Sequence, residues 1–367
     1  GGDEFAWLVD HHMDHADVAK FGERCRSLLA KSFTYDGNVL NIYASIGVAF
    51  APLDAGTDED LLKAADLALY AAKEAGRDTL RCYEAELSRK SQYKHDMVND
   101  LRKSIGSEDF FLVYQPQINF GDGDPTGFEA LLRWNRPGYG LVMPLEFIPL
   151  LEETGLIVPL GAWVMERACR DAMTWPSHLT IAVNLSGIQI ERSNVLSMID
   201  GVLAKTGLAP ARLEVELTES TIMKEIADVR PLLKALRDRG IRVALDDFGT
   251  GYSSLAYLSE FPFTKIKIDR SFITPICGAD STIARAIIRT ITQLAHTLHL
   301  ETTAEGIETL EQEEALNSMG CRHGQGYFYA KPISFEDTAI FLDAHKKAAV
   351  GREQSAPSAG RKKYAAA

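Results

Sequence analysis

The sequence contains little cysteine, no surplus of positive charge and no long apolar run. Its five cysteines are scattered without a CxxC spacing, which argues against a disulfide scaffold or a zinc site and favours reduced thiols in the cytoplasm. No apolar stretch is long enough to span a bilayer. The formal net charge of -12 also argues against a protein that binds nucleic-acid polymers, because such a protein needs a basic face.

What is present describes an ordinary globular protein. The chain has 367 residues, of which 46% are hydrophobic and 25% charged, and this is enough for two or more domains with their own cores. It begins with Gly1 rather than Met. We expect the protein in the cytoplasm. A segment upstream of Gly1 that carries a sensory domain or a membrane tether is left open.

The residue pattern divides the chain into four segments. The first contains strand-like runs such as "EFAWLV" and "NIYASIGVAFA" and helical stretches at about 17–31 and 58–75. A charged helical segment follows as a connector. In the third segment strands and helices alternate as in parallel β/α units, and the fourth is small, polar and unpatterned, so we expect it to be disordered. In the order described, these four segments comprise residues 1–83, 84–105, 106–347 and 348–367.

Strands of the third segment have one apolar face and place polar residues on the other face, near their C-terminal ends. In "RLEVELTES", for example, Leu213, Val215 and Leu217 alternate with Glu214 and Glu216. Parallel strands that close into a barrel gather these ends at one face, where such barrels keep their active sites. Buried carboxylates need cations, and oxygen ligands without Cys or His favour Mg²⁺ or Mn²⁺. The set of polar residues comprises three Glu, two Asp, one Asn and one Lys, and includes Glu129, Asn184, Glu216, Asp246, Lys267 and Glu305, while Arg133 shares the face of Glu129.

The stretch "VALDDFGTGYSSL" at 243–255 places two aspartates side by side after an apolar strand. Neighbouring side chains of a strand point to opposite faces. Asp246 and Asp247 therefore converge only if the strand stops there and the chain bends, and we expect Gly249 and Gly251 to permit that bend. Taken alone, this stretch is equally compatible with an ordinary turn.

Seven motifs in series resemble those of the EAL-domain cyclic di-GMP phosphodiesterases: "FEALLRW", "VNLS", "VELTES", "DDFGTGYSSL", "KIKIDRSFI", "TTAEGIE" and "GQGYFYAKP". The resemblance covers about residues 92–345. It implies a (β/α)₈ barrel of the TIM type whose first strand is antiparallel to the others. "GGDEF" at 1–5 and "ADLALYAAKEAGRD" at 65–78 resemble the C-terminal part of a GGDEF diguanylate cyclase domain, an α/β domain that would be truncated here.

The resemblance also implies a role for individual residues. Two metal ions would bind per active site, Mg²⁺ or Mn²⁺, with Asp246 shared between them, and Ca²⁺ is expected to inhibit because it prefers more ligands at longer distances. The implied metal ligands are Glu129, Asn184, Glu216, Asp246, Asp247 and Glu305. Lys267 and Gln325 would lie beside the attacking water and act in catalysis with Asp246, Asp247 and Glu305. Gln115 and Arg133 would contact the substrate, Glu219 would hold the "DFGTGYSS" loop, and Glu308 would support the ligands from behind.

The leading hypothesis is metal-dependent hydrolysis of cyclic di-GMP to linear 5'-pGpG. A second is a receptor that binds cyclic di-GMP without cutting it, and the intact ligand set argues against it. A third is a barrel lyase or aldolase in which Lys267 forms a Schiff base, but the acidic ring would keep that amine protonated. We expect no diguanylate cyclase activity, because upstream cyclase elements are missing. The resemblance further implies a homodimer formed through the loop after the aspartate pair.

Overall fold

The computed structural model describes residues 3–9, 15–224, 226–249, 258, 260–278 and 281–355. It divides into two compact units, Gly1–Asn99 and Asp100–Ala367. The division falls inside helix α3 (Ala85–Ser104), which coincides closely with the expected connector. Within the described residues, no helix combines the length and the apolarity that crossing a bilayer requires.

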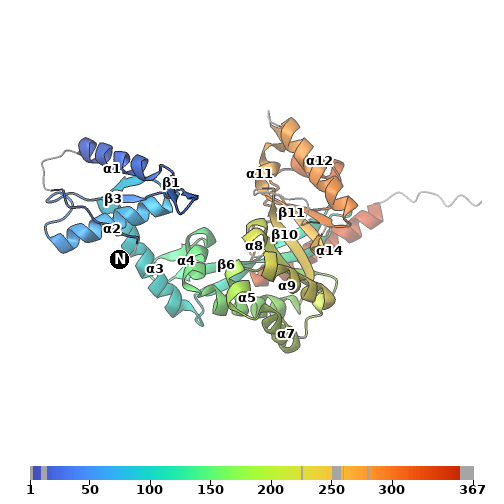
Figure 1. The fold of residues 1–367 in the computed structure, drawn as a ribbon. Helices are drawn as coiled ribbons and strands as arrows, with labels where there is room; N and C mark the ends of the chain where they lie inside the picture. Colours follow the sequence, from blue (N-terminus) through green and yellow to red (C-terminus); the bar gives the residue numbers. More distant parts are fainter. Residues whose placement is uncertain are drawn as a thin grey trace, which may run out of the picture. The chain divides into compact units, whose positions relative to one another are not determined.

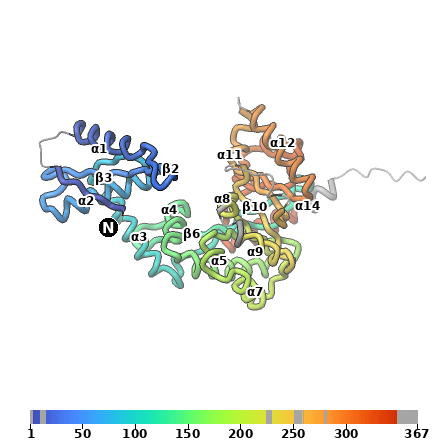
Figure 2. Tube along the Cα trace, viewed as in Figure 1, coloured from blue at the N-terminus to red at the C-terminus, as the bar shows by residue number. Residues whose placement is uncertain are grey.

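The N-terminal unit is built on two short parallel strands, β3 (Ile46–Val48) and β4 (Leu80–Cys82). Helix α2 (Asp58–Glu74) packs on them through buried alanines, and Gly47 allows this close approach, since a Cβ there would lie 2.2 Å from the Ala65 carbonyl oxygen. The remaining elements are helix α1 (His15–Leu29) and a hairpin of β1 (Phe33–Tyr35) and β2 (Asn38–Leu40). Figure 2 traces them in blue.

The strand predicted for "EFAWLV" does not form. Residues 4–9 have no regular structure, and no described segment pairs with their backbone. A strand needs a neighbour for its N–H and C=O groups, and sequence alternation alone does not supply one. Phe5 and Leu8 are accordingly 88% and 87% exposed in this unit.

The second unit is the predicted barrel. Strand β5 pairs antiparallel with both β6 and β13, which closes the sheet, and the other pairs around the barrel are parallel. The expected antiparallel first strand is therefore confirmed. The short strand β7 (Gly140–Val142) pairs antiparallel with the C-terminal end of β6 and lies outside the closed ring. The eight barrel strands are β5 (Phe110–Asn119), β6 (Pro125–Arg136), β8 (Thr180–Asn184), β9 (Leu213–Thr218), β10 (Arg242–Phe248), β11 (Lys265–Ile268), β12 (Glu301–Ala304) and β13 (His323–Gly324).

Helices cover the outside of the barrel, as Figure 1 shows. Helix α5 packs on β8, α9 on β10, α12 on β11 and β12, and α14 on β5. The outward strand residues between them, such as Val215, Val243 and Ile266, are fully buried and form the apolar core. The helices of this unit are α4 (Pro144–Thr154), α5 (Ile157–Ala172), α6 (Gly187–Arg192), α7 (Val195–Thr206), α8 (Glu219–Lys224), α9 (Ile226–Asp238), α11 (Arg270–Ile273), α12 (Ser281–Thr297), α13 (Leu310–Ser318) and α14 (Phe335–Ser355), with 3₁₀ turns at Pro210–Arg212 and Thr274–Cys277.

Helix α14 ends at Ser355, beyond the boundary at 347 after which we expected disorder. Continuing a helix needs only local backbone hydrogen bonds, so the loss of an apolar pattern does not end it. Residues 356–367 lie outside the described part of the chain.

Candidate active site

The polar ends of the barrel strands line one pocket of about 280 Å³. Each side chain arrives from a different strand or from the turn that follows it, as the alternation pattern predicts. Residues that contribute to its wall include Gln115, Glu129, Asp246, Lys267, Glu305 and Gln325.

The two adjacent aspartates converge through an irregularity in β10. The register against β11 shifts between Leu245 and Phe248, and Asp247 has a φ of 54°. This left-handed conformation is tolerated better by Asp than by most residues, and the extra residue of a bulge re-aims side chains. The bend therefore occurs at Asp247 itself, within the strand. Gly249 continues the bend with a φ of 96°, a conformation that favours glycine, as predicted; Gly251 lies outside the described residues.

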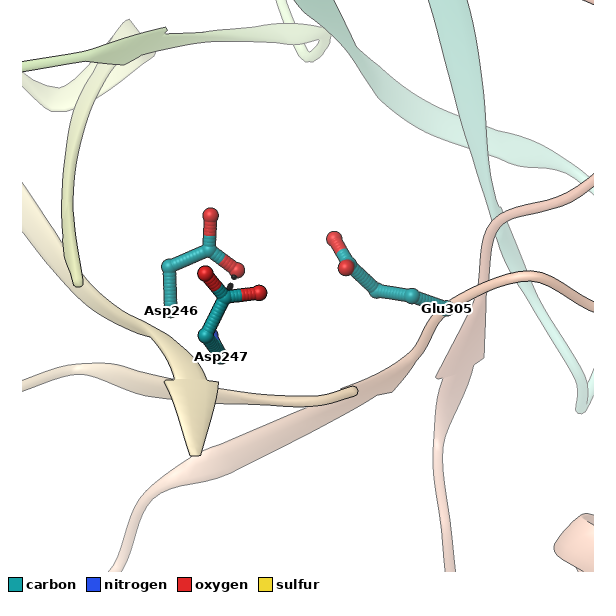
Figure 3. A group of neighbouring side chains, drawn as sticks. All are labelled: Asp246, Asp247 and Glu305. Atoms are coloured by element: carbon teal, nitrogen blue, oxygen red, sulfur yellow. Dashed lines mark hydrogen bonds between the residues drawn. The ribbon is translucent and has the colours of Figure 1, made fainter. Parts of the chain in front are cut away.

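Three carboxylates meet at this point. Ligand oxygens of Asp246, Asp247 and Glu305 all lie within 4.8 Å of one another, and Figure 3 shows the pair on β10 facing Glu305 across the pocket. The Asp247 backbone N–H donates to Asp246 Oδ1 at 2.9 Å, which fixes the first carboxylate relative to the second.

Lys267 lies at the centre of a wider acidic group. Its ammonium nitrogen is 2.6 Å from Glu216 Oε2, 2.7 Å from Glu305 Oε1, 3.2 Å from Asp246 Oδ1 and 3.5 Å from Glu129 Oε2. The side chain is only 1% exposed. Three ammonium protons cannot satisfy four carboxylates fully, so these acids share a single resident cation.

Glu129 is held by two amides in addition. Asn184 Nδ2 donates to its Oε1 at 2.8 Å, and Gln325 Nε2 donates to its Oε2 at 2.6 Å. Gln325 Nε2 also donates to Gln115 Oε1 at 3.0 Å. The Asn184 amide therefore points its nitrogen at the acid. Presenting its oxygen to a cation instead requires only a flip of the amide group.

Burial and crowding change the acidity of the cluster. Burial, reinforced by Asp246 and Glu129 against the opposing charge of Lys267, raises the pKa of Glu305 to about 8. Burial likewise raises the pKa of Glu216 and Asp247. Although burial acts in the same sense on Glu129, the charge of Lys267 and the amide hydrogen bonds lower its pKa.

These features fit divalent cations. When the acids of the cluster are ionised, the four carboxylates around Lys267 and the carboxylate of Asp247 carry five negative charges against one positive charge, and two divalent ions would balance the remainder. Glu216 Oε1 is buried and has no hydrogen-bond partner among the described residues. A buried oxygen of this kind is costly unless something binds it. The donor set is all oxygen, as Mg²⁺ and Mn²⁺ prefer.

A second polar layer nearer the N-terminal ends of the strands is balanced without metal. Lys265 lies 2.5 Å from Glu214 Oε1, and Arg242 lies 3.0 Å from Glu214 Oε2. Lys265 also donates to Gln117 Oε1 at 3.0 Å. Here the buried carboxylate of Glu214 is paired with two cations, so a buried acid in this barrel does not by itself mark a metal site. The excess of acids over cations around Lys267 distinguishes the upper layer from this one.

The remaining predicted residues lie around this centre. Glu219 is buried and its Oε2 accepts a hydrogen bond from the Gly249 N–H at 3.0 Å. Arg133 is half-buried, and its Nη1 donates a hydrogen bond to the Leu132 carbonyl oxygen at 2.8 Å. Glu308 pairs with Arg270 at 2.6 Å rather than with a proposed ligand. The loop through which we expected dimerisation, 250–257, lies outside the described residues.

Arg270 lines the pocket but is not among the residues predicted from the sequence. The sequence feature that could have indicated Arg270 is its position directly after "KIKID", at the C-terminal end of a barrel strand like the other site residues. Its contact with Glu308 spans 38 positions, and no periodicity links residues so far apart.

Comparison with known proteins agrees with this geometry. Residues 98–332 match the EAL domain, and residues 1–79 match the diguanylate cyclase GGDEF domain. The bifunctional diguanylate cyclase/cyclic di-GMP phosphodiesterase MucR of Pseudomonas aeruginosa is 38% identical over 92% of this chain and 49% of its own length. The cyclic di-GMP phosphodiesterase NbdA of the same organism is 37% identical over 94% of this chain and 44% of its own.

The solved structure of the PaMucR phosphodiesterase in complex with c-di-GMP is 39% identical, with a TM-score of 0.63, and covers 66% of this chain and 99% of that chain. The chain spans less than half the length of the two curated relatives. The GGDEF match, residues 1–79, covers only part of the first unit, Gly1–Asn99. On this evidence of motif, fold and similarity, the chain belongs to the EAL domain family and carries part of a GGDEF domain at its N-terminus.

Proposed function

We propose that the barrel hydrolyses cyclic di-GMP to linear 5'-pGpG with two Mg²⁺ or Mn²⁺ ions. The observation that carries the proposal is the meeting of Asp246, Asp247 and Glu305 within 4.8 Å beside the buried Lys267. It is supported by the MucR and NbdA relatives, whose names specify cyclic di-GMP phosphodiesterases.

The reaction adds a water oxygen to one phosphorus atom and breaks its bond to the 3'-oxygen, leaving a 5'-phosphate on the linear product. The ions, when bound, would supply charge stabilisation and a more acidic water. Glu129, Asn184, Glu216, Asp246, Asp247 and Glu305 would hold them. Asp246 lies within 4.8 Å of ligand oxygens of both Asp247 and Glu305, and the family resemblance implies that it is the ligand shared by the two ions.

The other side chains orient the reactants. The ammonium of Lys267 donates hydrogen bonds and would hold the attacking water in line with the leaving oxygen. Gln325 and Gln115 are bonded to each other at 3.0 Å and offer further polar contacts at the pocket wall. Arg133 presents a guanidinium fork that suits a phosphate.

Three further statements belong to the proposal. The chain makes no cyclic di-GMP, it forms a homodimer through the barrel unit, and it acts in the cytoplasm. The last is supported by five cysteines that are all free, as in a reducing compartment.

Turnover after metal removal tests the proposal. The chain is stripped with EDTA, dialysed, and incubated with cyclic di-GMP with and without Mg²⁺, and nucleotides are separated by chromatography. We expect pGpG only when Mg²⁺ is restored. Binding of cyclic di-GMP without any product under all metals would contradict the enzyme and favour the receptor.

A further inference from the structure

A groove of about 510 Å³ lies between helices α5 and α7, which pack against each other outside the barrel strands. Its wall shares no residue with the active-site pocket. One part of the wall is apolar and includes Trp163, Met198 and Val202, while the other part is charged. A concave surface of about 300–1,000 Å³ that combines apolar side chains with a few polar groups is typical of a small-molecule site.

The charged part of the wall contains more cations than acids. Arg170 and Lys205 both bind Glu166, the lysine at 2.8 Å, so one carboxylate serves two cations. Arg167 is a third cation, and Glu166 is the only acid among the described residues of the wall. The molecule as a whole has the opposite sign, with a formal net charge of -12. A concave surface with this local charge attracts an anion.

Two side chains of the wall retain hydrogen-bond donors for a ligand. Arg167 contacts Asp171 through its Nε–H alone, at 2.9 Å from Oδ2, and no described residue accepts a hydrogen bond from its Nη1 or Nη2. These two groups can therefore bind a phosphate while Nε stays on Asp171. The indole N–H of Trp163 likewise has no acceptor among the described residues.

Arg167 also connects the groove to the interior of the barrel. The carboxylate of Asp171, which Arg167 binds, accepts a hydrogen bond from the Tyr114 hydroxyl at 2.6 Å. Tyr114 lies on β5, next to Gln115 of the active-site pocket. Asp171 and Tyr114 are both buried, and a buried hydrogen bond responds strongly to a nearby charge. An anion on Arg167 would weaken the hold of that guanidinium on Asp171, so the carboxylate would depend more on Tyr114.

We propose that this groove is a regulatory site for a small molecule that combines one phosphate group with a flat apolar ring. Arg167, Arg170 and Lys205 bind the phosphate, whose three free oxygens match three separate cations. The ring packs on Trp163 and Met198, because aromatic rings and thioether sulfurs both make favourable contacts with a ring. The bound charge then acts along the hydrogen bonds to β5. The site does not depend on the hydrolysis proposed above, since the two walls have no residue in common.

The test follows the indole N–H signals by NMR while the metal-free chain is titrated with phenyl phosphate. The sequence contains four tryptophans, and Trp163→Phe and Trp175→Phe assign the two signals that matter. Trp163 reports binding in the groove. Trp175 reports a change at Tyr114, because their ring centroids are 5.3 Å apart. Trp134 is buried and donates to Ser104, so its signal is the internal reference. Inorganic phosphate and phenol, the two halves of the probe, are titrated separately.

We expect the signals of Trp163 and Trp175 to shift together until they saturate, with a smaller dissociation constant for phenyl phosphate than for phosphate or phenol. Tyr114→Phe removes the hydroxyl that binds Asp171. It should retain the shift of Trp163 and lose most of the shift of Trp175. An unmoved Trp163 signal would overturn the site, and a shift of Trp163 alone in the wild type would overturn its connection to β5.

Variants of the cations test what holds the phosphate. Arg170→Met and Lys205→Met keep an apolar stem, and each should raise the dissociation constant at least about 5-fold, the upper end for a charge pair at the surface. Arg230→Met is the matched control, because Arg230 forms an exposed pair with Glu260 that does not line the groove, and it should leave the constant unchanged. Wild-type binding in both cation variants, or equal constants for phenol and phenyl phosphate, would contradict a phosphate site.

Discussion

Lys267 and Glu216 form a salt bridge of 2.6 Å in the barrel interior, with side chains only 1% and 0% exposed. The pair differs from the Lys265–Glu214 pair below it, at 2.5 Å, in its surroundings. Glu214 has a second cation in Arg242, whereas Lys267 is shared with three further acids. Two similar pairs on the same two strands thus serve different purposes, one as structure and one as part of the proposed metal centre.

Replacing each lysine should separate these purposes. We expect Lys267→Met to lower kcat by at least about 100-fold, the lower range for a positioned proton-handling group, and to lower the Tm of the metal-free chain in a way that Mn²⁺ restores. Lys265→Met is the matched control on the same strand. It should lower Tm without metal rescue, and equal rescue of both variants would contradict the distinction.

The shared ligand should be the most sensitive position for conservative change. Asp246→Asn retains the side-chain volume but weakens the ligand proposed to contact both ions, and we expect kcat to fall by more than about 100-fold, beyond the usual loss for supporting residues. Wild type should be active with Mg²⁺ or Mn²⁺ and poorly active or inhibited with Ca²⁺, because Ca²⁺ prefers six to eight ligands at longer distances. The assay is initial rates in each metal. Similar rates in all three would argue against the two-metal site.

Glu219 should act through the backbone of the loop that it holds. Removing its acceptor with Glu219→Ala leaves the Gly249 N–H without its 3.0 Å partner, and we expect a loss of about 10–100-fold in metal affinity or activity. Glu219→Gln retains an oxygen acceptor and should therefore recover part of the lost metal affinity or activity. Metal titrations and kinetics of both variants check this, and wild-type values for Glu219→Ala would refute the role.

Metal binding should depend on pH through Glu305. With its pKa raised to about 8 from about 4.3 in an unfolded chain, the metal-free folded state binds the extra proton between these values. Its stability should therefore fall as pH rises through that window. A metal must displace the proton, so affinity should rise from pH 6 towards 8 with proton release. Calorimetry in two buffers of different ionisation enthalpy measures this release, which should shrink in Glu305→Gln. Affinity that is flat with pH would contradict it.

The N-terminal unit should not synthesise cyclic di-GMP. Its GGDEF match covers only residues 1–79, and the segment "EFAWLV" has no strand partner among the described residues. Incubating the chain with GTP and Mg²⁺ should yield no cyclic di-GMP by chromatography. Detection of the dinucleotide in that assay, at a rate that scales with protein concentration, would disprove the expectation.

The barrel and its polar ring could be predicted from sequence because alternation with period two fixes which face each side chain occupies. Glu216, Lys267 and Asp246 meet for that reason. The bulge at Asp247 could not be predicted, since it depends on register against β11. The ion pair of Arg270 and Glu308 depends on how two turns approach each other, and the helix from Phe335 to Ser355 continues without the apolar pattern that would mark it.

The central claim is most directly tested by hydrolysis of cyclic di-GMP in ¹⁸O-labelled water. Purified chain is incubated with Mg²⁺ and the product is analysed by mass spectrometry. The account predicts linear pGpG with one labelled oxygen on its 5'-phosphate, and no product from Asp246→Asn. Intact cyclic di-GMP, or a linear product without the label, would contradict it.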